Sequence, residues 1–261
     1  MVTKLGILEV SSPEMEIPIF GGQVTIVGYG KRHHEPEFHW SLRTLNLLRD
    51  VLGRKNEKIL TYVAKIAERY NLERVYAPNT QEFNGKIISD FTENEFPFES
   101  TFPIYGKLPY GTYLKRGPLA DGVVIPKMMN YPPLIGKTAF VMSSADCALI
   151  VVKNNETVIA AHAGRNSLVQ RIKNNDATDV VQEIMKAIDD KPVGNTQVWI
   201  GCSIRPGPHF AHFRYDTRYP SNGDMIDRIL KGYGPSCFTD TGKTKDLGWL
   251  DSKELARRQF M

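Results

Sequence analysis

Two apolar, β-branched runs separated by four polar residues restrict the fold of this chain more than any other feature. The runs are Cys147–Val152 and Thr157–Ala163, with the sequence KNNE between them. Short runs of this kind form strands, and asparagine tolerates the positive φ values that a tight two-residue turn requires. The segment therefore predicts an antiparallel β-hairpin.

The register of this hairpin decides which side chains meet. If Asn154 and Asn155 form the turn, Lys153 pairs with Glu156, and Cys147 lies directly opposite His162. Directly opposed residues share a face and have Cβ atoms about 4.5–5.5 Å apart. A three-residue loop or a β-bulge would shift the register by one residue and place the two side chains on opposite faces.

A thiol beside an imidazole has two functional interpretations and one structural interpretation. Cys147 can become a thiolate nucleophile with His162 as its base, or both can bind a metal such as zinc. The structural alternative is a buried cysteine that packs as a small apolar residue, with a histidine that binds a loop carbonyl.

Strand-like and helix-like segments alternate along the rest of the chain, which predicts an α/β fold. We expect helices in residues 56–72, 176–190, 221–234 and 250–261, and further strands in residues 21–30, 73–78, 85–91, 121–126, 136–144 and 196–204. The polar, proline-rich residues 92–117 predict a long surface loop. Ile59, Val63, Ile66 and Tyr70 recur at helical spacing in the first helix, and Val180, Val181, Ile184 and Ile188 share one face of the second. The second helix should begin at Asp176 or Thr178, and the last has the capping-box pattern of Asp251 and Glu254.

Length and composition indicate one globular domain over residues 1–261. The final helix has no stop signal before Met261, a pattern expected of a truncated domain. With 33 basic and 29 acidic residues spread evenly, neither nucleic acid nor a membrane is the expected partner. No secretory signal opens the chain, so we expect a cytoplasmic protein with its three cysteines reduced.

Other polar clusters are weaker candidates. The segment RHHEPEFHW (residues 32–40) has three histidines and two glutamates but no regular spacing, so a solvated loop is the favoured interpretation. His209 and His212 favour surface or packing roles, and Cys202 and Cys237 are not expected to be nucleophiles.

The segments ADC (residues 145–147) and HAG (residues 162–164) resemble the core motifs of the laccase-domain family, also called YfiH-like or polyphenol oxidase family. SLRTLNL (41–47), LADG (119–122), WIGCSIRPGPHF (199–210) and WLDSKELARRQF (249–260) are similar to further family segments. The resemblance implies a single layered α/β/β/α domain with mixed sheets, related to putative cysteine hydrolases. It also implies a site of two histidines and one cysteine that often holds zinc.

The same resemblance implies purine nucleosides and phosphate as substrates. The family's activities are phosphorolysis of adenosine, inosine or methylthioadenosine, deamination of adenosine and, in older attributions, copper-dependent oxidation of polyphenols; we do not expect copper here. Cys147 and His162 match the family's catalytic and metal-binding residues. The resemblance adds Ser41, Asn46, Asn84 and Arg165 as substrate-binding candidates.

This sequence departs from the family pattern at the first histidine of the site. TQEFNG places Asn84 there, and an alternative alignment on FPIYG places Tyr105 there. Neither side chain is a usual zinc ligand, so a three-ligand zinc site is in doubt. Three hypotheses follow: a purine nucleoside phosphorylase or deaminase, a metal-free Cys–His hydrolase, and a nucleoside-binding protein without turnover.

Overall fold

The fold is known from a computed structural model of the 261-residue chain. It describes residues 14–19, 24–29, 67–79, 85–88, 113–126, 138–140, 147–154, 157–173, 178–189, 196–201, 211–213, 222–240 and 247–261. Contacts divide the chain into one unit of residues 1–39 and a second unit of residues 40–261. The prediction of a single domain over residues 1–261 stays a prediction.

The first unit contains one antiparallel hairpin. Strand β1 (Glu14–Ile19) pairs with β2 (Val24–Tyr29), and Ile17 lies opposite Ile26. The sequence predicted β2 but not β1, whose glutamates and prolines obscure any strand pattern.

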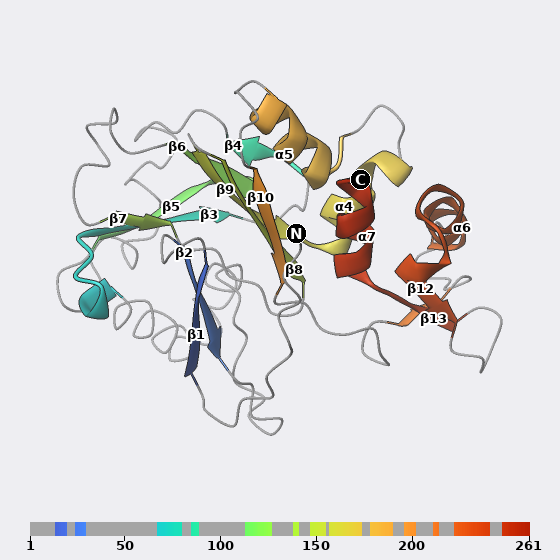
Figure 1. The fold of residues 1–261 in the computed structure, drawn as a ribbon, viewed down its shortest axis with the longest axis horizontal. Coiled ribbons are helices and arrows are strands. Elements are labelled where there is room, and N and C mark those ends of the chain that lie inside the picture. Colours follow the sequence, from blue (N-terminus) through green and yellow to red (C-terminus); the bar gives the residue numbers. More distant parts are fainter. Residues whose placement is uncertain are drawn as a thin grey trace, which may run out of the picture. The chain divides into compact units, whose positions relative to one another are not determined.

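A five-stranded mixed sheet is the largest sheet of the second unit (Figure 1). Its strand order is β10-β8-β9-β6-β4, and every neighbouring pair is antiparallel except β4 and β6. The strands are β10 (Gln197–Gly201), β8 (Ala148–Lys153), β9 (Thr157–Ala163), β6 (Gly122–Pro126) and β4 (Ile87–Ile88). All five fall in segments where the sequence predicted strands.

Two three-stranded sheets complete the β-structure described in this unit. Strands β5 (Tyr113–Leu119) and β7 (Thr138–Phe140) both pair in parallel with β3 (Arg74–Asn79). Strands β11 (Ala211–Phe213) and β12 (Phe238–Asp240) both pair antiparallel with β13 (Leu247–Leu250). The predicted loop over residues 92–117 is wrong at its end, because Tyr113 already pairs with β3, a contact that local sequence does not reveal.

Helices cover one face of the five-stranded sheet and form the core with it. They are α4 (Arg165–Lys173), α5 (Val180–Asp189) and α7 (Ser252–Gln259), with α6 (Asn222–Tyr233) and the short 3₁₀ helix η8 (Pro235–Cys237) nearby. The core residues of β8 and β9 are Ala148, Ile150, Val152, Ile159, Ala161 and Ala163. Because side chains alternate along a strand, Leu149, Val151, Ala160 and His162 point to the other face.

The predicted buried face of α5 is confirmed, but its predicted start is wrong. Val180, Val181, Ile184 and Ile188 are all buried in the core. The N-cap is Asp179, whose Oδ1 accepts a hydrogen bond from the Gln182 N–H at 2.8 Å, and Gln182 Oε1 accepts from the Asp179 N–H at 3.3 Å. This reciprocal capping box uses Gln182. The sequence alone does not distinguish a glutamine in this role from a glutamine inside the helix.

Two other helix ends follow from local chemistry. The helix at residues 67–69 ends where Asn71 takes a φ of 51°, and the Leu72 N–H binds the Ala67 carbonyl at 2.7 Å, as in a Schellman motif. Tyr70, predicted on the apolar face of that helix, is exposed. Helix α7 begins as predicted, with Asp251 accepting from the Glu254 N–H at 2.9 Å.

The mixed α/β class with mixed sheets is therefore confirmed, and the layered α/β/β/α arrangement stays a prediction. Helix α4 was not predicted, because RNSLVQRIK is strongly polar. In the described part of the chain, no helix has the length and apolar character needed to cross a membrane.

Candidate functional site

The predicted hairpin exists, but its predicted register is wrong. Leu149, rather than Cys147, lies opposite His162, and Lys153 lies opposite Val158. The reason is that Asn154 remains in the ladder: its Oδ1 accepts from the N–H and the hydroxyl of Thr157 at 2.8 and 3.0 Å. Lys153 therefore does not pair with Glu156, as a turn at Asn154–Asn155 would require.

Cys147 and His162 still belong to the same end of the hairpin. The observed register differs from the predicted one by two residues along β8. Because side chains alternate between the two faces of a strand, a shift of two residues does not change the face on which each side chain is expected. Cys147 immediately precedes β8, in a bend, and is partly exposed. It stands two residues before the cross-strand partner of His162, a diagonal position rather than the direct opposition that we predicted.

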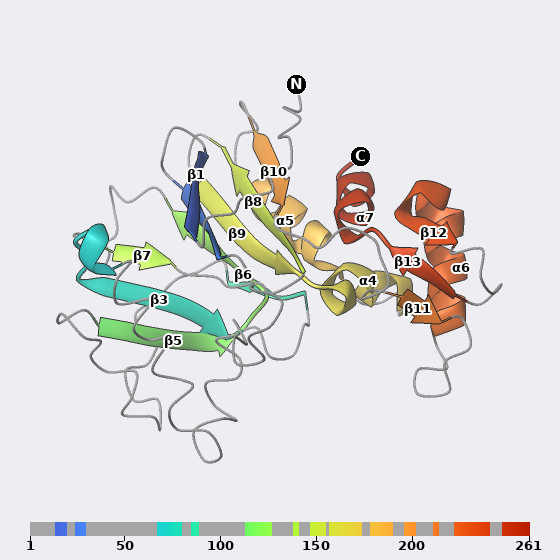
Figure 2. The ribbon, with the colours of Figure 1, turned by 90° about the horizontal axis from the view of Figure 1, so that it is seen from below.

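His162 is buried on the sheet face that lies opposite the helix-covered core. Only 4% of its surface is exposed. Its neighbours are set by two ladders, because β9 runs between β8 and β6 (Figure 2). On the β8 side its partner is Leu149. On the β6 side its backbone N–H donates to the Asp121 carbonyl at 2.7 Å.

Asp121 places a carboxylate directly beside this imidazole. The residue lies in the bend between β5 and β6, one position before β6, and is fully buried. Its Oδ1 lies 3.6 Å from His162 Nδ1. Its Oδ2 accepts a hydrogen bond from the Gly85 N–H, which anchors one of the two carboxylate oxygens.

Sequence reasoning missed Asp121 as a site residue. The sequence contains one indication of its role, because Asp121 is an acidic residue inside the apolar segment LADGVVIP. A carboxylate that is buried needs a partner. What the sequence did not reveal was that β6 pairs with β9, a contact that joins residues about forty positions apart.

Arg165 is the first residue of α4, directly after the Gly164 that follows His162. The Leu168 N–H binds the Gly164 carbonyl at 3.0 Å, which starts the helix at the end of the HAG motif. Arg165 is partly buried at this helix N-terminus. The structure therefore brings Cys147, His162 and Arg165 to one end of the hairpin.

The other predicted site residues lie outside the described residues. They are Ser41, Asn46, Asn84 and Tyr105, together with the histidines of residues 32–40, His209 and Cys202. His212 lies in β11, which belongs to a different sheet from His162.

The described residues do not fit a zinc centre. A catalytic zinc takes three protein ligands, and within the described ranges no group of three histidine, cysteine, aspartate or glutamate side chains is arranged to hold a metal. Cys147 and His162 would supply two. We therefore derive no chemical step through a metal from these residues.

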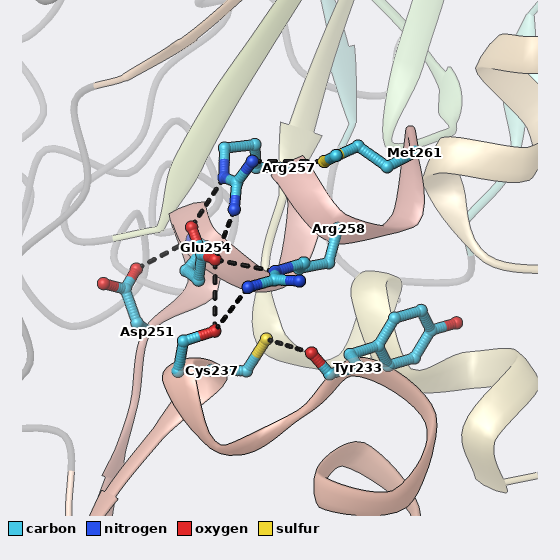
Figure 3. Close-up of polar contacts among 8 residues, drawn as sticks. Tyr233, Cys237, Asp251, Glu254, Arg257, Arg258 and Met261 are labelled. Atoms are coloured by element: carbon cyan, nitrogen blue, oxygen red, sulfur yellow. Dashed lines mark hydrogen bonds and ion pairs between the residues drawn. The ribbon is translucent and has the colours of Figure 1, made fainter.

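A second cluster with a cysteine and carboxylates lies where η8 meets α7 (Figure 3). Glu254 accepts hydrogen bonds from Arg257, Arg258 and Ser236, and the Arg257 guanidinium is the main cause that lowers the pKa of Glu254 to about 2. Burial, followed by the Glu254 carboxylate, raises the pKa of the Cys237 thiol to about 11. Its Sγ lies 3.8 Å from the Tyr233 carbonyl. This thiol stays protonated, in agreement with the prediction that Cys237 is no nucleophile.

Comparison with known proteins gives distant structural similarities. No family model matches the sequence, and no curated protein matches it. A crystal structure from Neisseria meningitidis, described as family DUF152, is 18% identical with a TM-score of 0.47, over 76% of this chain and 63% of its own. The hypothetical protein YfiH of Bacillus licheniformis is 16% identical with a TM-score of 0.42, over 78% and 66%.

This chain thus spans less than two thirds of the length of either structure. The second description carries the name of the YfiH-like family that the ADC and HAG motifs resemble. The chain is distantly similar in structure to these two proteins.

Proposed function

We propose that this chain is an enzyme that acts on purine nucleosides and that His162 transfers the proton in its reaction. The observation that carries the proposal is that Cys147, His162 and Arg165 all lie at the same end of the β8–β9 hairpin. The substrate class comes from the resemblance of ADC and HAG to the laccase-domain motifs.

The candidate reactions need a proton-transferring group and, for phosphorolysis, a phosphate ligand. His162 and Arg165 are groups of these two kinds. In phosphorolysis a phosphate oxygen bonds to the ribose C1′, the bond from C1′ to the purine breaks, and the departing purine takes up a proton. In deamination water adds at the purine C6 and gives up a proton, and ammonia leaves. An imidazole moves such protons efficiently near neutral pH, and positioned acid–base groups contribute about 10²–10⁴-fold to the rate.

Arg165 is the candidate phosphate ligand. A guanidinium binds phosphate through a planar fork of donors, and the N-terminus of a helix adds a partial positive charge. Arg165 occupies the first position of the nine-residue helix α4, so both contributions act at one place. This arrangement favours phosphorolysis over deamination.

The experiment measures products from adenosine, inosine and methylthioadenosine, each with and without phosphate, together with the metal content of the purified protein. Wild type is compared with the variants Cys147→Ala and His162→Gln, and Cys237→Ala controls for removal of a thiol. We expect His162→Gln to lower turnover about 100-fold or more. Equal turnover by wild type and His162→Gln would contradict the proposal. Tight binding of a nucleoside without product would point to a binding protein.

A metal-free Cys–His hydrolase is the second candidate. It requires only the Cys147 thiol and the His162 imidazole, which lie at the same end of the hairpin. In this reaction His162 takes the thiol proton and the Cys147 thiolate bonds to a carbon of the substrate, whose bond to the leaving group breaks as that group takes up the proton. Water then cleaves the bond between carbon and sulfur and restores the thiol. Protein free of zinc that loses its activity when Cys147 is alkylated, and that accumulates a covalent adduct on Cys147, would support this candidate.

A further inference from the structure

The contacts that fold the chain explain only part of the burial of Asp121. The carboxylate is fully buried, although ionisable groups are rarely buried without a partner. Oδ2 has such a partner in the Gly85 N–H. Oδ1 is also shielded from solvent and has no hydrogen-bond partner among the described residues. Folding alone accounts for one oxygen of this carboxylate but not for the other.

The backbone fixes where that second oxygen points. The Asp121 N–H donates to the Lys86 carbonyl at 2.8 Å, and its carbonyl accepts from the His162 N–H at 2.7 Å. In the ladder of β6 and β9, Gly122 lies opposite Ala161, so Asp121 is the residue directly opposite His162. Opposed side chains share a face, which brings Oδ1 to 3.6 Å from Nδ1.

A separation of 3.6 Å is longer than a hydrogen bond, which ends near 3.2 Å for N–H···O. Catalytic hydrogen bonds are often long without substrate and shorten in the reacting complex. The backbones of the two residues are already hydrogen-bonded to each other at 2.7 Å, which holds the two side chains close together.

We infer that Asp121 is the positioning residue that holds His162 as the Nδ1–H tautomer, the form in which Nε2 carries the lone pair. A carboxylate has only acceptors, so the neutral imidazole gains a hydrogen bond when its proton sits on Nδ1. In the proposed reaction, Nε2 is then the ring nitrogen that takes up the proton. The role of Nε2 rests on the proposed function, whereas the tautomer is a property of the protein alone.

The variant Asp121→Asn tests this inference with little change in shape. The amide oxygen can keep the hydrogen bond from Gly85, and the amide NH₂ then faces Nδ1. A donor at this place requires a lone pair on Nδ1 and moves the proton to Nε2. We therefore expect the tautomer of His162 to switch.

The measurement is the ring-nitrogen NMR spectrum of protein with ¹⁵N-labelled histidine, at a pH about two units above the ordinary histidine pKa of ~6.5. The variant His162→Gln assigns one signal set among the six histidines. The control Asp179→Asn makes the same change at another buried aspartate, which caps α5. It should leave the His162 tautomer unchanged.

We expect wild type and Asp179→Asn to show Nδ1–H, and Asp121→Asn to show Nε2–H with kcat about 100-fold lower and KM little changed. An Nε2–H tautomer in wild type would overturn the inference even if Asp121→Asn does not fold. So would the same tautomer in wild type and in folded Asp121→Asn. A tautomer switch without turnover of any nucleoside would sustain the positioning role and contradict the proposed function.

Discussion

Two regions of this protein combine a thiol with carboxylates, and they differ in how those groups are satisfied. At the junction of η8 and α7, the oxygens of Glu254 are bound by Arg257, Arg258 and Ser236, and Cys237 is buried with a raised pKa. At the end of the β8–β9 hairpin, Cys147 is partly exposed, and buried Asp121 directs one oxygen toward His162.

The difference shows that composition alone does not make a site. The partners of Glu254 are mostly one turn away on its own helix, so that cluster forms whenever α7 forms. The partners of Asp121 come from two segments far from it along the chain, residues 85–86 and strand β9, so its surroundings exist only in the folded sheet. Groups brought together from distant segments are the better candidates for chemistry.

The largest expected difference between the two regions is thiol reactivity. A pKa of about 11 leaves Cys237 with about 100-fold less thiolate than an ordinary cysteine, and burial slows it further. Iodoacetamide should therefore modify Cys147 before Cys237 in the native protein. Peptide mass spectrometry over time measures both, with unfolded protein as the control. Faster modification of Cys237 than of Cys147 would contradict this prediction.

Removing the carboxylate of Asp121 or of Glu254 should lower the free energy of unfolding by different amounts. Asp121→Ala leaves the buried Gly85 N–H without its acceptor, which costs about 1–3 kcal/mol. Glu254→Ala removes exposed ion pairs worth less than ~1 kcal/mol. Urea unfolding of both variants gives the two free energies, and a greater loss for Glu254→Ala would contradict this ranking.

Gly85 tests whether the support of Asp121 is rigid. Gly85 has a φ of +75°, and an added Cβ would meet the Thr178 carbonyl at 3.2 Å, so Gly85→Ala should cost about 1–2 kcal/mol. Gly232 in α6 has open space around its Cβ position, and Gly232→Ala should stabilise by about 0.4–1 kcal/mol. Thermal unfolding compares the pair. A Gly85→Ala variant that is as stable as wild type or more stable would show that Gly85 is not constrained.

The smallest expected effect is the pH dependence of the Glu254 cluster. Its pKa is about 2 in the folded protein and near 4.5 when unfolded, so its stabilisation is complete above pH 4.5 and disappears as the pH falls toward 2. Because the arginine partners are exposed, we expect less than ~1 kcal/mol, reduced further by salt. Wild type and Glu254→Gln should therefore converge in acid. A constant difference in unfolding free energy across this range would assign the stabilisation to another group.

Local sequence patterns predicted elements well where one face is apolar. Helix α5 was predicted from Val180, Val181, Ile184 and Ile188, and β9 from the run Thr157–Ala163. Helix α4 and strand β5 were missed, because polar residues hide their patterns and their partners lie far along the chain. The hairpin register was missed by two residues, because the Asn154 side chain closes the loop differently from a simple Asn-Asn turn.

By itself, the sequence determined that Cys147 and His162 lie near each other at one end of a hairpin, because a short turn leaves few possible registers. Only the tertiary structure decided which residue stands opposite His162. That residue is Leu149 on one side and Asp121 on the other. The physical reason is that strand pairing between β6 and β9 depends on packing of the whole sheet, whereas the hairpin depends on a few neighbouring residues.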